Sequence, residues 1–266
     1  MTDYLLFRLY GPLASWGDVA VGELRPSHAA PTKSAVFGLI AAALGLRRDD
    51  ADAQASLHES YGFAVRVDHA GELLLDYHSI ETPYARAIDD EEPPTTRRDE
   101  LRAAAALAQR ASDGAGSKTN LSRREYRSDA LAAAAIWIVA PKGARWTLEE
   151  LAAALRSPTF VPYLGRKSCV VALPFAPTRA QAEHPVHALR DVAFAVDALL
   201  VGRPSSHRHE FRWEGAPADP LAQQTVRRRD QARSRTKWLF ADREEHVRVE
   251  LVSGEPKEGS RVSQPN

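Results

Sequence analysis

The sequence is short of the residues that build disulfide frameworks and membrane spans. The 266-residue chain contains one cysteine, Cys169, so a disulfide within the chain is impossible, and this usage fits a reducing cytoplasm. No apolar run reaches the roughly 20 residues that a membrane-spanning helix needs. The first residues, a polar stretch followed by a strand pattern, do not resemble a secretory signal. We therefore expect a cytoplasmic protein without membrane contact.

Motifs for cofactor and metal chemistry are also missing. The chain has no phosphate-binding loop and no dinucleotide fingerprint. The two close histidine pairs, His184 with His187 and His207 with His209, have neither cysteine partners nor the spacing of a zinc helix. Cys169 opens an apolar run, which favours a buried structural thiol over a nucleophile. The sequence predicts no cofactor, no metal and no catalytic residue.

Charge is balanced overall but uneven along the chain. The formal net charge is zero, yet residues 97–127 hold eight basic and four acidic side chains, and residues 201–243 hold ten and five. Acids gather at residues 49–52 and 89–92. Local basic stretches on a neutral chain suit a protein that grips a polyanion at chosen places. The alternative is that these stretches are solvated faces.

Arginine outnumbers lysine by 29 to 6. A guanidinium binds phosphate in a fork and stacks on bases, so this bias suits contacts with RNA. A GC-rich genome produces the same bias, and we attribute most of it to genome composition.

Hydrophobic periodicity indicates an α+β protein. Residues 5–10 alternate as a strand, and the apolar run to Leu46 predicts a helix capped by Thr32 or Ser34. Residues 63–67 and 73–80 follow as strands. Strand, helix, strand, strand is the start of the ferredoxin-like plan that RRM domains share.

The rest of the chain sets the predicted domain boundaries. Residues 136–139 return to a strand, and Thr147 with Glu150 predicts a capping box that opens a helix to Arg156. We expect a ferredoxin-like domain over 1–160, interrupted by a long polar insertion at about 81–128. A smaller β-rich half over 161–253 should pack on it. Residues 254–266 lack periodicity and predict a disordered tail.

The start of the helix after Pro31 is a candidate anion site. Backbone N–H groups point outward at a helix N-terminus and the helix dipole favours anions there. Lys33, between Thr32 and Ser34, and the upstream Arg25 would add positive charge. The alternative is simple capping of a core helix.

Two further basic segments are candidate binding sites. Arg166 and Lys167 follow Gly165 in a turn whose N–H groups could cradle an anion; the alternative is an ordinary polar turn. Residues 227–237 form the densest basic run, and Trp238 and Phe240 follow it, so stacking beside phosphate contacts is possible. The alternative is a solvated loop with Trp238 in the core.

These segments resemble one known family when they are taken together. Residues 4–17, 25–34, 36–46 and 160–169, in this order and separation, are similar to the CasD family of the type I-E CRISPR surveillance complex, Cascade. The resemblance implies a ferredoxin-like core of the RAMP superfamily, the repeat-associated RNA-binding proteins of CRISPR systems. In that fold the insertion at about 81–128 would be a projecting thumb.

The resemblance also implies a function in antiviral defence. Such a subunit binds the 5′ handle of the CRISPR RNA, caps the CasC backbone, neighbours the large subunit CasA and meets target DNA only through the complex. The candidate RNA-binding residues are Arg25, Thr32, Lys33, Ser34, Arg97, Arg98, Arg123, Arg124, Arg166, Lys167, Arg227 and Arg228.

Two other functions stay open at this point. In a related CRISPR subtype a homologous subunit is the endoribonuclease that processes precursor RNA, with a Lys-His pair in its proposed centre. None of the six lysines here is followed by histidine, which argues against metal-independent cleavage, although His28 and His78 are proton carriers by type. A pure protein scaffold without RNA contact is the third class.

Overall fold

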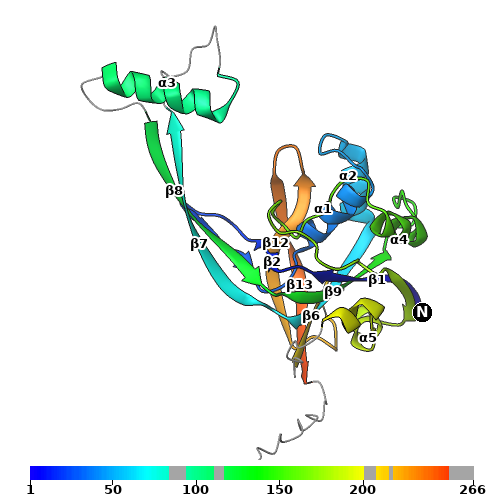
Figure 1. The fold of residues 1–266 in the computed structure, drawn as a ribbon. Coiled ribbons are helices and arrows are strands. Elements are labelled where there is room, and N and C mark those ends of the chain that lie inside the picture. The colour runs from blue at the N-terminus through cyan, green and yellow to red at the C-terminus, as the bar shows by residue number, and fades with distance from the viewer. Residues whose placement is uncertain (84–93, 111–116, 201–207, 216–217, 252–266) are drawn as a thin grey trace, which may run out of the picture.

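The computed structural model describes residues 1–83, 94–110, 117–200, 208–215 and 218–251 (Figure 1). The predicted tail at 254–266 and the acidic stretch at 89–92 lie outside these ranges. Within them the chain is a mixed α/β protein built on one large sheet, from which a long two-stranded arm projects.

The main sheet has seven strands in the order β10-β1-β9-β6-β11-β13-β12, and every neighbouring pair is antiparallel. The strands are β1 (Thr2–Tyr10), β6 (Tyr61–His69), β9 (Leu131–Ile138), β10 (Thr178–Ala182), β11 (Arg208–Trp213), β12 (Gln224–Ser234) and β13 (Leu239–Leu251).

Helices connect the first four strands of this sheet. Helices α1 (Lys33–Ala43) and α2 (Ala51–Ser60) lie between β1 and β6, and α4 (Leu148–Arg156) lies between β9 and β10. Apart from the inserted arm, the chain therefore runs strand, helix, strand, strand, helix, strand. In the sheet these strands stand in the order fourth, first, third, second.

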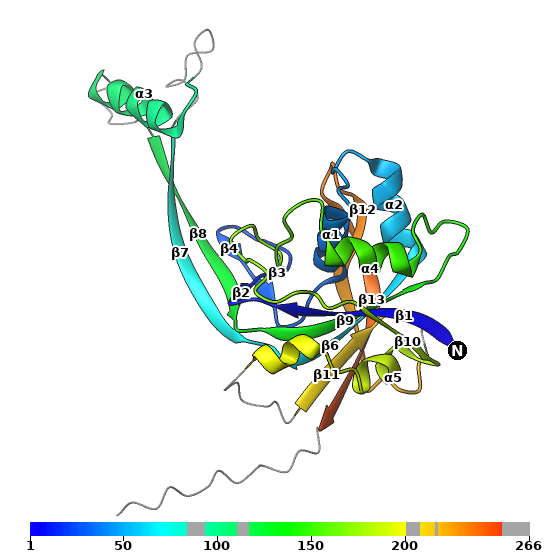
Figure 2. The same ribbon diagram turned by 45° about the vertical axis from the view of Figure 1, so that its right-hand side comes forward.

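Alternation along the strands divides the core between the two faces of the sheet. Leu5, Phe7 and Leu9 of β1 face α1, α2 and α4 in one buried cluster, while Tyr4 and Leu6 face the opposite side. That second cluster is covered by the short helix α5 (Pro185–Arg190), as Figure 2 shows. This is the period-two pattern of a sheet that is buried on both faces.

Local capping behaves as the sequence predicts at both main helices. Thr32 caps α1 and accepts a hydrogen bond from the N–H of Ala35. Thr147 and Glu150 form the predicted capping box of α4, and that helix ends at Arg156. Cys169 is fully buried, as the sequence predicts for a structural thiol, and burial raises its pKa.

The projecting arm corrects one expectation. Residues 73–80 were expected to form the third strand of the main unit, but they belong to β7 (Glu72–Pro83), which pairs with β8 (Ser117–Ser128) outside the main sheet. The third strand of the main unit is β9. The pattern misled because β7 is apolar on an exposed arm: Leu73 is 54% exposed and Tyr77 is 60% exposed.

Helix α3 (Arg97–Arg110) lies at the far end of the arm, against β7 and β8 (Figure 1). At the near end, β8 also pairs with the short strands β2 (Leu13–Ala14) and β4 (Leu24–Arg25). Two more short strands, β3 (Trp16–Gly17) and β5 (Ser27–His28), pair beside them.

The C-terminal strands extend the main sheet. Strand β11 pairs with β6, and β13 and β12 continue outward from it. The division near residue 160 stays a prediction, because strands from both sides of it share this sheet.

Candidate nucleic-acid interface

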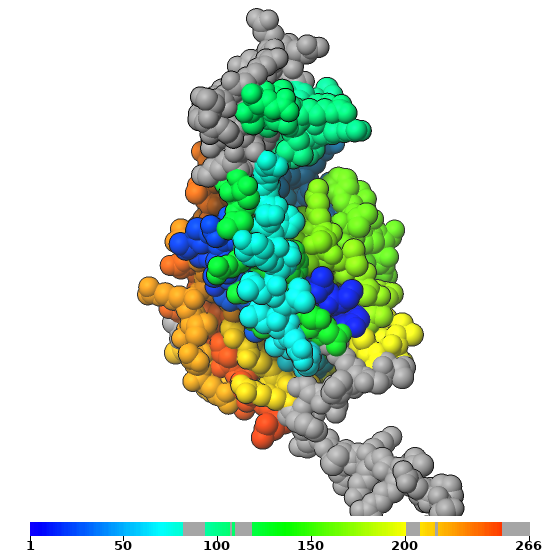
Figure 3. Space-filling view, turned by 60° about the vertical axis from the view of Figure 1, so that its left-hand side comes forward, coloured from blue at the N-terminus to red at the C-terminus, as the bar shows by residue number. Residues whose placement is uncertain are grey.

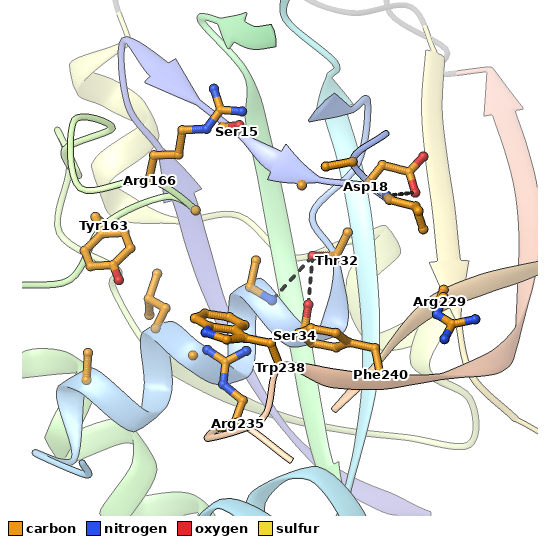
Figure 4. A pocket seen from close by; sticks show the side chains of 18 residues that line it. Ser15, Asp18, Thr32, Ser34, Tyr163, Arg166, Arg229, Arg235, Trp238 and Phe240 are labelled. Carbon is orange, nitrogen blue, oxygen red and sulfur yellow. Dashed lines mark hydrogen bonds between the residues drawn. The ribbon is translucent and has the colours of Figure 1, made fainter. Parts of the chain in front are cut away.

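A pocket of about 490 Å³ opens beside the first turns of α1 (Figure 4). Four segments that are distant in sequence form its walls: the loop around β3, helix α1, the turn after Pro162 and the β12–β13 hairpin. Its charged, hydroxyl and aromatic lining residues are Ser15, Asp18, Thr32, Ser34, Tyr163, Arg166, Arg229, Arg235, Trp238 and Phe240.

The β12–β13 hairpin supplies an aromatic wall with attached cations. The guanidinium of Arg235 lies 5.1 Å from the ring centre of Trp238, and that of Arg48 lies 4.5 Å from it. The rings of Trp238 and Phe240 are 6.2 Å apart. Burial and the nearby Arg48 lower the pKa of Arg235, yet an arginine stays charged at any physiological pH. The wall therefore presents π surface beside fixed positive charge.

The turn after Pro162 closes the opposite wall. Gly165 has φ of +90°, and a Cβ there would lie 1.7 Å from the carbonyl oxygen of Ser15, so only glycine fits. The next side chain, Arg166, donates hydrogen bonds to the backbone oxygens of Glu125 and Arg25, each at 3.1 Å. It also lies over the ring of Tyr126. This glycine thus holds Arg166 between the pocket and the base of the arm.

Helix α1 forms the floor, and its N-terminus already carries an internal anion. The carboxylate of Asp230 accepts a 2.7 Å hydrogen bond from the backbone N–H of Lys33. Gly38 faces the pocket, where a Cβ would lie 3.1 Å from the guanidinium of Arg235. The floor is therefore flat and lined by small residues, and Asp230 occupies the place where a phosphate was expected.

A buried ion cluster fixes the hairpin beside this floor. Arg243 binds Asp230 at 2.6 Å and Glu245 at 2.7 Å, while Arg228 and Arg212 each bind Glu245 at 2.9 Å. These cations lower the pKa of Glu245 against the effect of burial. Because Asp230 belongs both to this cluster and to the cap of α1, the position of the hairpin is tied to the helix.

Two of the predicted RNA-binding residues, Lys33 and Arg228, instead form buried ion pairs. Lys33 is 4% exposed, and its ammonium binds both carboxylate oxygens of Glu214 at 2.9 Å. Burial lowers the pKa of Lys33 although Glu214 opposes the effect. Arg228 is buried against Glu245. The capping pattern and the basic run exist in the structure as a helix start and a strand. The side chains of Lys33 and Arg228, however, form ion pairs inside the core, so we no longer count them among the candidate RNA-binding residues.

Four predicted residues do meet at the base of the arm. Arg25 is exposed on β4, and its backbone oxygen accepts the hydrogen bond from Arg166. Strand β4 runs parallel to β8, with Leu24 beside Arg123 and Arg25 beside Arg124. Arg25, Arg123, Arg124 and Arg166 form a cationic strip at the base of the arm, in which the adjacent Arg123 and Arg124 point to opposite faces of β8 and Arg166 also lines the pocket.

The other predicted residues are less concentrated. Thr32 and Ser34 line the pocket floor, with their hydroxyls 3.5 Å apart. Lys167 is exposed next to Arg166, and Arg227 is exposed on β12. Arg97 and Arg98 begin α3 at the tip of the arm, where Arg97 pairs with Glu100 on the surface.

Three pocket residues were missed as individual sites: Tyr163, Arg229 and Arg235. The basic run was singled out, but which of its arginines face out depends on the alternation of β12, where Arg227 and Arg229 are exposed and Arg228 and Asp230 are buried. Trp238, weighed between stacking and the core, is 52% exposed. Reading the run as a strand with period two would have separated the two sets.

Each of the two histidines that are proton carriers by type lies beside an aspartate. His28 pairs with Asp18 at 3.2 Å, and burial together with Arg228 lowers its pKa. His78 lies on the arm, 3.7 Å from Asp76. No group of three or more His, Cys, Asp or Glu side chains there could hold a metal ion. None of the helices within those ranges is long and apolar enough to cross a bilayer.

The fold and the pocket together define a mixed α/β protein with an aromatic, arginine-lined cavity and an attached cationic strip. Three arginines and a single acid, Asp18, line the cavity, so its chemistry suits an anionic ligand with planar groups. The family model described as CRISPR-associated protein (Cas_Cas5) matches residues 4–246. The chain belongs to this family.

Similarity to individual proteins confirms the predicted resemblance. The Cascade subunit CasD of Escherichia coli (strain K12) is 34% identical over 189 residues, which span 71% of this chain and 76% of that protein. A chain from a CRISPR RNA-guided surveillance complex is 22% identical with a TM-score of 0.57, covering 94% of this chain and 90% of its own. A solved Cas protein is 27% identical with a TM-score of 0.53, covering 93% and 94%. The structure from the surveillance complex, at 22% identity, supports the fold alone.

Proposed function

We propose that this protein is the RNA-binding, non-catalytic subunit of a Cascade-type CRISPR surveillance complex, acting in the cytoplasm in antiviral defence. The pocket carries this proposal, because it combines exposed aromatic rings with Arg166, Arg229 and Arg235. Single-stranded RNA is bound by this pairing of stacking surface and cations.

The architecture fits the same proposal. The order of β10, β1, β9 and β6 and the helices between them correspond to a ferredoxin-like core of the RAMP superfamily. The arm of β7, β8 and α3 is its thumb. The expected partners are the 5′ handle of the CRISPR RNA, the backbone subunit CasC and the large subunit CasA, with target DNA met only through the complex.

The geometry suggests how the RNA lies. The cationic strip of Arg25, Arg123, Arg124 and Arg166 would follow phosphates from the base of the thumb. The pocket would receive the next nucleotide, with its base against Trp238 or Phe240 and its phosphate near Arg229 and Arg235. Lys167, at the turn beside Arg166, would extend the strip.

Catalysis forms no part of the proposal. His28 pairs with Asp18, and burial lowers its pKa, while His78 lies on the arm beside Asp76. None of the six lysines in the sequence is followed by histidine, so the Lys-His pair of the related endoribonuclease is missing. Metal-independent cleavage of precursor RNA remains the alternative against which this is tested.

The test uses labelled CRISPR repeat RNA without added metal. Trp238→Ala should weaken binding by about 1–3 kcal/mol, the value of one stacked base. The double variant R229A/R235A should lower the dependence of binding on salt by about 0.7 per lost phosphate contact. Arg156→Ala, an exposed arginine on α4 that pairs with Glu149, is the matched control and should bind as the wild type does.

Two results would refute the proposal. Unchanged affinity and salt slope in both pocket variants would show that RNA does not use this pocket. A single discrete RNA product that disappears in His28→Ala or His78→Ala would make the protein an endoribonuclease.

A further inference from the structure

Strand β7 is an open sheet edge of unusual length. Among the described strands it pairs with β8 alone, through twelve consecutive residue pairs from Glu72 with Ser128 to Pro83 with Ser117, and the register has no shift. Figure 3 shows this strand, in cyan, running along the surface towards α3. Its outer row of backbone N–H and C=O groups has no strand beside it in the described part of the chain.

Several of the usual protections of such an edge are missing, and its only strong charges are three acids, Glu72, Asp76 and Glu81. Exposed edge strands are normally short, bulged, or guarded by lysine or by an internal proline. Strand β7 has no lysine or arginine, and its proline is the last residue. Leu73, Leu75 and Tyr77 share one face and are 54–60% exposed, and Leu74 is also exposed on the other face. A long, regular and apolar edge of this kind is a template for pairing with another chain.

Charge on the hairpin separates two surfaces. Strand β7 carries three acids, Glu72, Asp76 and Glu81, and no cation apart from the weak base His78. The neighbouring β8 carries the arginines, Arg123, Arg124 and Arg127. A polyanion would be attracted to the β8 side and repelled along the β7 edge. This charge pattern favours a polypeptide over RNA along the β7 edge.

We propose that the outer edge of β7 accepts an extended segment of another protein subunit by β-strand addition. Main-chain hydrogen bonds would supply affinity, and alternate side chains would supply specificity. The segment should be apolar at the positions that flank Leu73, Leu75 and Tyr77, with lysine or arginine near Asp76. At about 3.3 Å per residue, twelve residues offer an edge of about 40 Å. This rests on the proposed function only in taking the partner from the same complex.

Hydrogen–deuterium exchange tests the proposal directly. The exchange of β7 amides would be followed in the isolated chain, in the chain with CRISPR repeat RNA, and in the complex assembled by co-expression of the subunits of the same locus. We expect exchange of alternate β7 amides to slow at least about tenfold in the complex, and not with RNA alone.

A variant set separates the strand contact from RNA binding. The triple variant L73K/L75K/Y77K places charge on exposed positions of β7 and should fold, yet it should be retained at least about tenfold less in the purified complex. Because two of the added lysines stand opposite Arg127 and Arg123 and can only strengthen contacts with phosphates, its affinity for repeat RNA should be no lower than that of the wild type. The control V139K/L199K/L251K makes the same change at three exposed apolar positions elsewhere and should assemble normally.

Three outcomes would overturn the inference. Protection of β7 by RNA alone would make the nucleic acid the occupant. Protection in the isolated chain that rises with protein concentration would make a second copy the occupant. Unchanged exchange of the β7 amides in an intact complex would show that no segment of another subunit pairs with this edge. Loss of RNA affinity in the pocket variants is measured separately, so failure here is distinct from failure of the proposed function.

Discussion

At the scale of single residues, His58 is a buried polar side chain that is unfavourable to the core. It lies on α2 with 2% exposure, and its ring is 5.4 Å from that of Phe37. Neither ring nitrogen has a hydrogen-bond partner in the described ranges. Burial, with repulsion from Arg235 and Lys33, lowers its pKa to about 3. His58 is therefore neutral when folded and is protonated readily only after unfolding.

This produces a pH dependence of stability with a definite sign. Below the unfolded pKa of about 6.5 the unfolded chain binds a proton that the folded chain refuses, so the free energy of unfolding falls as pH falls towards 3. Between pH 8 and pH 5 the loss from this residue should be about 2 kcal/mol. Urea denaturation at the two pH values should show this loss in the wild type. In His58→Leu the drop in the free energy of unfolding should be smaller by about 2 kcal/mol. An equal loss in both proteins would contradict the assignment.

Residue roles at the candidate site could be predicted only in part. Chemical type was enough to nominate Arg25 and Arg166, because a cation beside a turn or short strand usually reaches the surface. It was not enough for Lys33, whose fate depends on Glu214, 181 positions away in the sequence. Whether a cationic side chain is available to bind a ligand depends on ion pairs with residues that are distant in the sequence. The local sequence does not contain that information.

At the scale of elements, the arm is physically separate from the core. Neither of the two large buried clusters contains a residue between Gly71 and Ser122. Tyr126 of β8 belongs to one cluster, and Arg123 and Arg124 pair with β4. Only the near end of the hairpin therefore contributes to the stability of the body.

Shortening the arm at a paired position should leave the body folded. Ser79 and Leu121 are cross-strand partners, so residues 80–120 can be replaced by an Asn-Gly turn that closes a two-residue hairpin. We expect the melting temperature to change by no more than about 4 °C, the effect of about 1 kcal/mol. The same protein should fail to form a stable surveillance complex. A much lower melting temperature, or normal assembly, would show that the arm has another role.

The elements were predictable where local chemistry decides. Thr32, Thr147 and Glu150 mark helix starts through side chain to backbone hydrogen bonds that need nothing distant. The assignment of residues 73–80 failed because an apolar strand looks alike in a core and on an exposed arm. Strand partners are tertiary information, and the long gap from 81 to 128 was the only local sign that the sheet order changes there.

At the scale of the whole molecule, the second buried cluster joins both parts of the chain. Tyr4 and Leu6 come from the first strand, while Val186, Phe211 and Trp213 come from beyond residue 160. Arg8 on the same face binds Asp68 and also Asp197. A chain cut at residue 160 would expose one whole face of its sheet.

Fragments test whether the predicted first domain can stand alone. Residues 1–160 should show no cooperative thermal transition, because α5 would no longer cover that face and β10 and β11 would no longer pair with β1 and β6. A chain ending at residue 251 is the matched control and should unfold cooperatively near the wild-type temperature. A sharp transition in the shorter fragment would establish an independent domain there and support the predicted boundary.

The unbroken twelve-pair register of β7 and β8 makes the arm an adjustable spacer. Adding one residue to each strand would lengthen it by about 3.4 Å without touching the body. Because side chains alternate with period two, an odd addition would also turn α3 to the opposite face, while an even addition would keep its orientation. Evolution or design can therefore change the reach of this protein in steps of about 7 Å while the tip keeps facing the same neighbour.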